Sequence, residues 1–250
     1  MRSLIVGSVF LVLAGAAHAQ EPVAVFGFDE GAGRRALDTS SHQRPGVVRR
    51  AVWVPGRHGT ALSFADPEAV VRVRRRPWLN LGSQLTLEAW IFPTVADDQS
   101  RIIIAKNDEY LLRLDKRSEG GRISFFVHVG SPAVTWEPRV CSLVPPPLQR
   151  WSHVAATWDG ANLRLYLNGE LQGEVARTGR PNPNPYPVMV GNFEYPSCHG
   201  GNFGGLIDEV RIYEQALSAE QIRERFLVWD GAHLKDGECG PPLRSGLSPT

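Results

Sequence analysis

The segment WSHVAATWDGANLRLYLNGELQGEV, residues 151–175, decides the fold class. Its apolar residues recur with a period of two, which is the spacing of half-buried β-strands. Two strands are therefore predicted, sharing one apolar face that should lie in a core. That face carries Val154, Ala156, Trp158, Leu163, Leu165 and Leu167. The opposite face, which includes Arg164 and Tyr166, is predicted to be exposed or to face a ligand.

The Asn-Gly pair at 168–169 favours a two-residue hairpin loop, because both residues tolerate positive φ. That register would place Leu167 opposite Glu170, so that apolar and charged side chains mix on one face. We therefore predict a three-residue loop or a bulge. The predicted pairs are Leu167 with Leu171 and Leu163 with Val175.

The first nineteen residues have the pattern of a secretory signal peptide. They open with Arg2, continue through the apolar LIVGSVFLVLAGAA and close on Ala-His-Ala at 17–19. The mature chain should therefore begin near Gln20, in a secreted or periplasmic protein. A membrane anchor is the alternative, but the apolar run is shorter than the roughly 20 residues that span a bilayer. No later segment is apolar enough to span one.

Composition gives little reason to expect a charged partner. The net charge of +1 does not indicate binding to nucleic acid or to an anionic membrane. A basic cluster lies at 72–76, where Arg72 and Arg74 alternate with valines, and we interpret it as a solvated strand face. Residues 20–229 are expected to form one β domain, and residues 230–250 a flexible tail.

Short β-favouring segments continue along the chain. The predicted strands are 23–28, 59–64, 70–73, 85–92, 101–105, 110–114, 122–129, 188–190 and 205–213. Ser218 and Gln221 have capping-box spacing, so one short helix should begin after Ser218 and end near Phe226 or Leu227. The proline-rich segments 145–147 and 182–187 are expected to be loops.

Three cysteines are present, at Cys141, Cys198 and Cys239. An exported protein is expected to form disulfides, and an odd number leaves one thiol over. We predict a bond between Cys141 and Cys198, which lie beside strands of the domain, whereas Cys239 lies in the tail. None of the three has zinc-site spacing.

Among the carboxylates, Asp208 has the most informative predicted position. Alternation places it on the apolar side of its strand with Val210 and Ile212, where a bare carboxylate would be costly. Calcium would fit, because it accepts carboxylate and carbonyl oxygens. Asp29 and Asp38, in the first long loop, are candidates to complete a structural calcium site. The alternative is that Asp208 accepts backbone N–H bonds or lies at a wet strand end.

Several of these segments together carry a family resemblance. FGFDEGAG, ALSF, LTLEAWIFP, the strand pair at 151–175 and GGLIDEVRIYEQALSAEQI follow one another in an order that resembles the laminin G-like, concanavalin A-like domains of exported bacterial proteins. The resemblance covers roughly residues 22–227. It implies an all-β fold, a two-sheet antiparallel jelly-roll sandwich, often with a calcium ion held partly by the aspartate matching Asp208. It also implies carbohydrate binding or adhesion.

Related jelly rolls include glucan hydrolases, which carry E-x-D-x-E or E-x-D-x-x-E on one strand. Alternate strand residues point into one cleft, where one carboxylate attacks and another protonates the leaving oxygen. Here Glu88 is followed at the alternate positions by Trp90 and Phe92, and Asp208 by Val210. We therefore predict no catalytic residues of this type.

Two loops combine aromatic and polar residues, as a sugar-binding surface requires. The candidate ligand-binding residues are Trp136, Glu137 and Arg139 before Cys141, and Asn192, Tyr195, His199 and Asn202 around Cys198. A disulfide between the two cysteines would join the loops into one rigid rim. The alternative is that Trp136 and Tyr195 only anchor the loops to the edge of the sandwich.

The leading hypothesis is thus an exported non-catalytic module that binds a glycan or a glycosylated surface. A second hypothesis is a polysaccharide-active enzyme with an unfamiliar site, using Glu137, Glu194 and His199. A third is a protein-binding structural module of the envelope.

Overall fold

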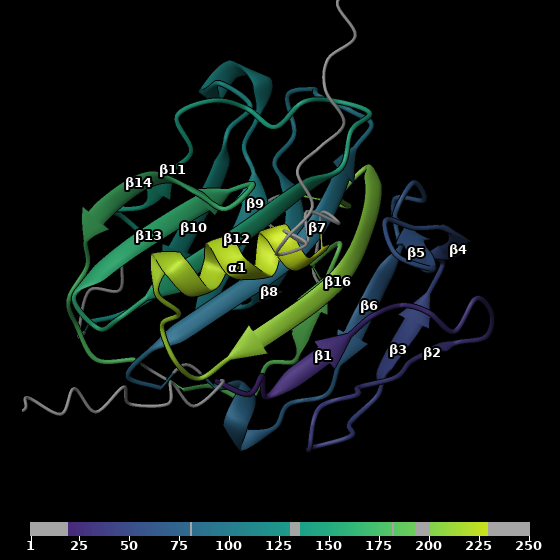
Figure 1. Cartoon of the computed structure of the whole chain (residues 1–250), viewed down its shortest axis with the longest axis horizontal. Helices are drawn as coiled ribbons and strands as arrows, with labels where there is room; N and C mark the ends of the chain where they lie inside the picture. Colours follow the sequence, from purple (N-terminus) through teal and green to yellow (C-terminus); the bar gives the residue numbers. More distant parts are fainter. Residues whose placement is uncertain (1–19, 81, 131–135, 182, 194–200, 230–250) are drawn as a thin grey trace, which may run out of the picture.

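The computed structural model describes residues 20–80, 82–130, 136–181, 183–193 and 201–229. Two antiparallel sheets stack as a sandwich, and one helix lies across the outer face of one sheet (Figure 1). The predicted signal peptide and C-terminal tail lie outside the described residues. Within the described ranges, no helix is long and apolar enough to cross a membrane.

Sheet A has the strand order β14-β13-β12-β7-β16-β5-β4, and β1 pairs with β16. Its strands are β1 (Ala24–Phe26), β4 (Val52–Pro55), β5 (Thr60–Ser63), β7 (Leu85–Pro93), β12 (Ser152–Trp158), β13 (Asn162–Leu167), β14 (Glu170–Ala176) and β16 (Gly205–Tyr213).

Sheet B has the order β11-β10-β9-β8-β15-β6-β3-β2. Its strands are β2 (Arg35–Ala36), β3 (Gly46–Arg49), β6 (Val70–Val73), β8 (Arg101–Lys106), β9 (Tyr110–Leu114), β10 (Ile123–Val127), β11 (Val140–Cys141) and β15 (Val188–Val190). Two 3-10 turns, η1 (Pro77–Leu79) and η2 (Arg117–Glu119), and the helix α1 (Ala219–Trp229) complete the elements. The chain changes sheet between β5 and β6, β6 and β7, and β7 and β8, which confirms the expected jelly-roll sandwich.

The core lies between the two sheets and contains the face predicted from the alternation in 151–175. All six predicted residues belong to one buried cluster, to which the inner faces of β9 and β10 also contribute. Trp158 is 1% exposed, and its indole Nε1 donates to the carbonyl of Arg177 at 2.7 Å. A buried donor without such a partner would cost free energy, so this bond lets the large ring lie in the core.

The turn between β13 and β14 confirms one predicted alternative and not the other. The loop has two residues, with Leu167 opposite Glu170, so both the three-residue loop and the pairing of Leu167 with Leu171 were wrong. Asn168 and Gly169 have φ of 52° and 77°, which a two-residue hairpin turn accepts. A bulge at Gln172 then restores the alternation, so that Leu163 lies opposite Val175 as predicted.

Helix α1 begins with the predicted capping box. Gln221 N donates to Ser218 Oγ at 3.3 Å, and Ser218 N donates to Gln221 Oε1 at 2.8 Å. The helix extends to Trp229, beyond the predicted end. Its apolar contacts with the outer face of sheet A form a cluster of Ala155, Tyr166, Tyr213, Leu217 and Ile222.

The prediction that Tyr166 faces solvent or a ligand was therefore wrong. Tyr166 is 2% exposed, because α1 covers this part of sheet A. Arg164, on the same face, lies at the margin and pairs with Asp159 at 2.6 Å and Glu174 at 2.8 Å. The sequence indicates a helix but does not say which face it covers.

A buried carboxylate, Glu88 of β7, lies beneath the helix. Its Oε1 hydrogen-bonds His153 Nε2 at 2.8 Å, Tyr213 OH donates to its Oε2 at 3.1 Å, and Arg225 Nη1 of α1 lies 4.0 Å from that Oε2. Burial raises the pKa of Glu88, but the hydrogen bond and charge of His153, with Arg211 and Arg225, hold it below the usual value. The charged carboxylate thus connects β7, β12, β16 and α1.

Gly191, directly after β15, offers a test of this packing. Its φ is 79°, and a Cβ there would overlap the ring of the buried Phe64. We expect Gly191→Ala to lower the free energy of unfolding by about 3 kcal/mol or more, from overpacking and a disfavoured φ together. Denaturant unfolding measures this. Gly33→Ala is the matched control, because its φ is 92° but nothing lies within 4 Å of its Cβ; it should cost only about 1–2 kcal/mol. Equal costs would contradict the packing described.

Candidate functional site

The outer face of sheet B carries two registered rows of side chains. One row crosses the strands as Ile102, Arg113, Ser124 and Cys141. The other crosses them as Ala105, Leu111 and Phe126. The apolar members of the two rows form a buried cluster, against which Trp136 and Phe193 pack. Trp136 belongs to the first predicted binding loop and Phe193 to the second, so one described residue from each loop packs on this face.

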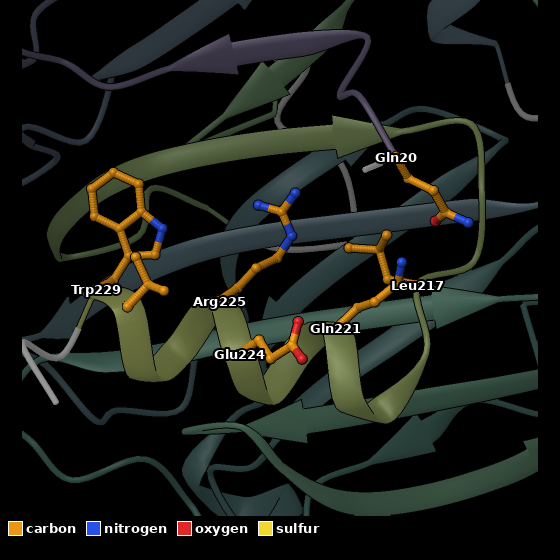
Figure 2. A pocket seen from close by; sticks show the side chains of 7 residues that line it. Gln20, Leu217, Gln221, Glu224, Arg225 and Trp229 are labelled. Atoms are coloured by element: carbon orange, nitrogen blue, oxygen red, sulfur yellow. The ribbon is translucent and has the colours of Figure 1, made fainter. Parts of the chain in front are cut away.

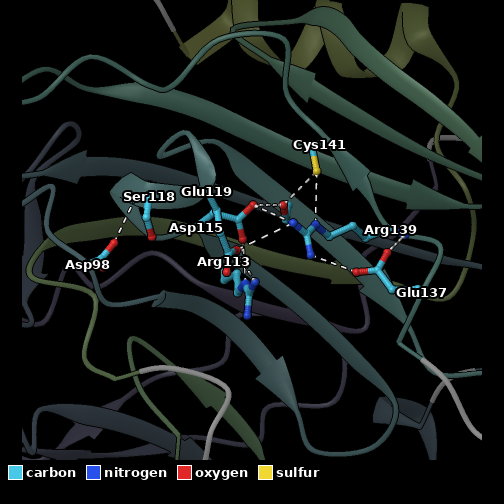
Figure 3. Close-up of polar contacts among 9 residues, drawn as sticks. Asp98, Arg113, Asp115, Ser118, Glu119, Glu137, Arg139 and Cys141 are labelled. Atoms are coloured by element: carbon cyan, nitrogen blue, oxygen red, sulfur yellow. Dashed lines mark hydrogen bonds and ion pairs between the residues drawn. The ribbon is translucent and has the colours of Figure 1, made fainter.

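An ionic network lies on the same face as the aromatic cluster, and Figure 3 shows its members Arg113, Asp115, Glu119, Glu137 and Arg139. Arg113 Nε lies 2.8 Å from Asp115 Oδ1, and its Nη2 lies 3.2 Å from Glu119 Oε2. Asp115 also accepts a hydrogen bond from the hydroxyl of Ser124. The Arg113 and Asp115 side chains are only 10% and 1% exposed, so they form the inner layer of the network.

Arg139 forms the outer layer of the same network. Its Nη1 lies 2.9 Å from Glu137 Oε1, and its Nη2 lies 3.7 Å from Glu119 Oε2 and 3.9 Å from Asp115 Oδ2. The side chains of Arg139, Glu119 and Glu137 are 27%, 35% and 60% exposed. These three residues therefore present both donors and acceptors to solvent.

Phe126 is the centre of the site. The guanidinium carbons of Arg113 and Arg139 lie 4.9 Å and 5.4 Å from its ring centroid, within the range of cation–π attraction. Trp136 meets Phe126 edge-on at 6.1 Å and lies 4.6 Å from the imidazole of His128. Phe126 itself is 4% exposed, so the groups around its ring, and not the ring, reach the surface. We call this region the Phe126 platform; it consists of Arg113, Asp115, Glu119, Phe126, Trp136, Glu137 and Arg139.

Cys141 carries a free thiol in this structure. Its Sγ lies 3.2 Å from Ser124 Oγ and 3.4 Å from Arg139 Nε. Cys198 and Cys239 lie outside the described residues. The disulfide between Cys141 and Cys198 is therefore not seen, and it stays a prediction.

The structure places Trp136, Glu137 and Arg139 together on the Phe126 platform, and their predicted role in ligand binding stays a prediction. Trp136 also packs on Phe126 and His128, so the ring serves in part as the loop anchor that was considered as the alternative. Tyr195 and His199, with Glu194 of the alternative enzyme site, lie outside the described residues.

Asn192 and Asn202 have internal partners. Asn192 is 8% exposed, donates to the carbonyl of Pro67 at 2.8 Å and accepts from the backbone N–H of Phe193 at 2.8 Å. Asn202 is 9% exposed, accepts from Arg101 Nη1 at 3.0 Å and donates to the carbonyl of Phe64 at 2.7 Å. Each amide therefore fixes its own described position, before or after residues 194–200, to neighbouring backbone groups.

Residues on the strands themselves were missed. Arg113, Ser124, Phe126 and His128 lie within or beside predicted strands, on the side opposite the core residues. The sequence contains a pattern that could have identified this outer face, because polar or bulky residues alternate with apolar ones in 110–114 and 122–129. Sequence reasoning placed the site in loops because polar and aromatic residues are more conspicuous there.

Arg177, at the end of β14, braces the platform from below. It is 7% exposed, and its Nε donates to the carbonyl of Val127 at 3.1 Å and its Nη1 to the carbonyl of Glu137 at 2.6 Å. Burial lowers the pKa of Arg177, and the charge of Glu137 opposes that shift. The guanidinium joins the end of β10 to the loop that carries Trp136.

The predicted orientation of Asp208 was wrong. A bulge between Asp208 and Arg211 places Ile207, Val210 and Ile212 in the core and Asp208 opposite Trp90, on the outer side of sheet A. Glu209 has a φ of 52° at the bulge. Simple alternation fails here because the bulge adds a residue.

Asp208 accepts three backbone N–H groups, as its alternative interpretation proposed. Its Oδ2 accepts from Arg57 at 2.9 Å and His58 at 3.1 Å, and its Oδ1 accepts from Glu209 at 2.8 Å. Burial raises the pKa of Asp208 to about 7, with repulsion from Glu209 adding to it and the backbone hydrogen bonds opposing it.

The other two predicted calcium ligands divide between two places. Asp29 accepts from Thr60 N at 3.1 Å, in the same turn, 56–60, that holds Asp208. Asp38 instead accepts from the backbone N–H groups of Val25, Ser40 and Arg44, at 3.0, 3.0 and 2.9 Å. Across the described part of the chain, no group of three or more His, Cys, Asp or Glu side chains is arranged to hold a metal ion.

A small hollow lies beside α1 (Figure 2). Because α1 covers sheet A and the Phe126 platform lies on the outer face of sheet B, the two are on opposite sides of the sandwich. It has a volume of about 280 Å³ and is lined by Gln20, Leu217, Gln221, Glu224, Arg225, Val228 and Trp229. This volume is below the roughly 300–1,000 Å³ typical of ligand pockets, so we do not assign a ligand site to it.

Replacing Arg177 tests the brace. Arg177→Met removes the guanidinium donors to the carbonyls of Val127 and Glu137, and we expect it to lower the free energy of unfolding by about 2–4 kcal/mol. It should also speed amide hydrogen exchange in residues 137–141, measured by mass spectrometry. Arg180→Gln removes a charge at a nearby exposed position and should change neither quantity. Unchanged exchange in Arg177→Met would show that the loop is held by other contacts.

Comparisons with solved structures agree with the fold. The binding domain of Paraclostridial Mosquitocidal Protein 1 is similar with a TM-score of 0.66 and 14% identity over 84% of this chain and 52% of that chain. Domain 4 of AbnA, a GH43 extracellular arabinanase from Geobacillus stearothermophilus solved with arabinotriose, is similar with a TM-score of 0.63 and 19% identity. The match covers 83% of this chain and 98% of that chain. The binding domain of botulinum neurotoxin DC, in complex with SialylT, is similar with a TM-score of 0.62 and 14% identity. The match covers 84% of this chain and 51% of that chain.

The chain thus spans about half the length of the toxin binding domains that it matches, and at these identities the similarity shows the fold. No curated protein matches the sequence significantly. A laminin G family profile, described as the concanavalin A-like lectin/glucanases superfamily, matches residues 67–223, which are 157 of the 250 residues. The chain therefore belongs to the concanavalin A-like lectin/glucanases superfamily, as a laminin G-like member.

Proposed function

We propose that this chain is an exported, non-catalytic module that binds a glycan or a glycosylated surface through the Phe126 platform. The observation that carries the proposal is the combination of Phe126 and Trp136 with two guanidinium groups and three carboxylates on one face.

The chemistry of the platform suits a sugar. A sugar ring offers apolar C–H faces, which pack on aromatic rings, and hydroxyl groups, which need both donors and acceptors. Trp136 is partly buried and can pack against such a face. Arg139 supplies donors, and Glu119 and Glu137 supply acceptors, at exposed fractions that leave them within reach of a ligand.

Preorganisation supports the same proposal. Arg113 and Asp115 fix Glu119 and Arg139 from the inside, and Arg177 fixes the backbone of Glu137. Binding a ligand would then cost little entropy to order these side chains, which favours affinity.

The similar solved structures support the proposal as well, since domain 4 of AbnA was solved with arabinotriose and the binding domain of neurotoxin DC with SialylT.

The carboxylates of the platform favour binding over hydrolysis. Asp115, Glu119 and Glu137 all lie in ion pairs with Arg113 or Arg139. Glycoside hydrolysis needs one carboxyl group to give a proton and another to attack or to activate water. The E-x-D-x-E pattern that supplies such a pair in related jelly rolls is missing from the sequence.

Substituting Trp136 tests the proposed site. On an array of neutral and charged oligosaccharides, the mature protein should bind at least one glycan, and Trp136→Ala should weaken that binding by about tenfold or more, because an aromatic contact of this kind contributes about 1.5 kcal/mol or more. Arg139→Ala should weaken it as well. Trp151→Ala, at a half-buried tryptophan of the other sheet, is the control and should retain binding. A folded wild-type protein that binds no glycan would refute the proposal.

We also propose that calcium binds at the turn 56–60, with a structural role. The site would use Asp208 and Asp29, whose carboxylates converge there, with Glu209 close by. Two glycines fit this interpretation: a Cβ at Gly56 would lie 2.7 Å from Asp208 Oδ2, and one at Gly59 would overlap the carboxylate of Asp29. Bound calcium would offset the repulsion among these carboxylates.

Asp38 does not belong to this proposed site. Its oxygens accept three backbone N–H groups in a separate loop. The remaining ligands would come from backbone carbonyls of the turn, which calcium accepts readily. Glu209 is already paired with Arg211 at 2.6 Å, so it would contribute charge more than coordination.

Chelation tests the calcium proposal. A chelator should lower the melting temperature of the wild-type protein, and calcium should restore it. Asp29→Ala and Asp208→Asn should respond much less, since each removes a proposed ligand. Asp38→Ala should be less stable, having lost its loop bonds, yet should keep the full response. A wild-type protein whose melting curve is the same with chelator and with calcium would contradict the site.

A further inference from the structure

Positive charge is concentrated in one part of the chain. Residues 34–76 contain ten arginines, no lysine and three acidic residues, a net charge of +7. The whole chain has a net charge of +1, so the remainder carries −6. An asymmetry of this size creates a local field that the overall charge conceals.

The fold gathers several of these arginines on one surface. Strands β2, β3 and β6 lie side by side at one edge of sheet B (Figure 1). Arg35, Val47 and Arg72 are direct neighbours across the three strands. Arg49 shares their face because it lies two residues from Val47. The core residues Ala36, Val48, Val71 and Val73 alternate with them, so the arginines point outward.

The local carboxylates do not neutralise three arginines of this surface, Arg35, Arg49 and Arg74. Asp66 and Glu68 both pair with Arg50, at 3.3 Å and 2.8 Å, and Asp38 accepts backbone N–H groups. Arg35, Arg49 and Arg74 are exposed. Within the described ranges, none of these three forms an ion pair. Three guanidinium groups therefore project into solvent around Val47, which is itself 41% exposed.

We propose that this arginine face, formed by Arg35, Arg49, Arg72 and Arg74, is a second binding surface for a linear polysaccharide that bears carboxylate or sulfate groups. Guanidinium groups match such anions because their planar forks donate two parallel hydrogen bonds. The strands set the spacing: Arg35 and Arg72 lie two strands apart, roughly 10 Å, and Arg72 and Arg74 about 7 Å apart along the chain. A repeating acidic polymer presents charges at regular intervals to such an array.

The same surface is poorly suited to nucleic acid. Single strands bind where aromatic rings stack on the bases, and the residues between these arginines are valines. Duplex grooves are read by a helix or a two-stranded ribbon that projects from the surface, whereas this face is part of a larger sheet. The sequence alone indicated only a solvated strand face at 72–76; the strand pairing adds Arg35 and Arg49 to it.

The test uses the mature protein with polygalacturonate, dextran sulfate and neutral dextran as probes. Wild type should bind one or both acidic polymers, and the binding should weaken as salt is raised. Arg35→Gln/Arg49→Gln/Arg74→Gln should weaken it by about 100-fold, from about fivefold for each cation held against an anionic surface. The control Arg122→Gln/Arg150→Gln/Arg223→Gln removes the same charge from other exposed positions and should change binding less than threefold, since an effect of overall charge alone is small.

Each outcome decides the proposal. Binding of polygalacturonate alone assigns the surface to uronates, and binding of dextran sulfate alone assigns it to sulfate esters. Equal losses in the two triple variants, or equally tight binding of duplex DNA, would overturn it, as would binding of neither acidic polymer. Trp136→Ala should keep acidic-polymer binding, so a failure of the Phe126 platform and a failure of the arginine face would be distinguished.

Discussion

The buried carboxylate of Glu88 connects helix α1 to the strands of sheet A that it covers. A charge 1% exposed is tolerated only when it is paired and hydrogen-bonded. Its partners are His153 of β12, Tyr213 of β16 and Arg225 of α1. Lifting the helix would separate Arg225 from this group and expose the apolar cluster around Tyr166. The part of the outer face of sheet A that lies beneath α1 is therefore closed to a ligand, whereas the outer face of sheet B carries no such helix in the described part of the chain.

Features that depend on regular spacing between nearby residues could be predicted from the sequence. The alternation in 151–175 identified the core face, and the spacing of Ser218 and Gln221 identified the helix cap, because both depend on residues close together in the chain. Bulges interrupt such reasoning. At Gln172 the conflict between the Asn-Gly turn and the apolar pattern was visible in the sequence, so a bulge could be considered. At Asp208 no such conflict was visible.

The bulge at Asp208 shows why distant contacts escape a sequence analysis. Its carboxylate is fixed by the backbone N–H groups of Arg57 and His58, which lie about 150 positions away in the chain. Nothing near Asp208 indicates that this turn will pack against β16. The site residues show a similar division. Trp136, Glu137 and Arg139 were predicted from their loop, whereas Phe126 gains importance only because Arg113 and Arg139 from other elements lie over its ring.

The two proposed surfaces of sheet B differ in charge for a structural reason. One registered row runs from Phe126 through Leu111, Ala105 and Met189 to Arg72, so the surfaces belong to the same face. At the Phe126 end, arginines are matched by carboxylates contributed by β9, η2 and the loop before β11. At the other end, β2, β3 and β6 contribute arginines, and the nearby carboxylates are taken by Arg50 and by backbone groups.

This difference in charge implies that the two proposed surfaces contribute differently to binding. A platform whose arginines are paired with carboxylates can hydrogen-bond hydroxyl groups through both donors and acceptors. An unbalanced arginine face attracts anions over a longer range, although salt screens that attraction beyond about 10 Å. A polymer with both neutral and acidic sugars could be drawn to the arginine face by its charge and be selected at the platform by its shape. Attraction and selectivity would then reside in different strands of one sheet, and each could change without disturbing the core that both share.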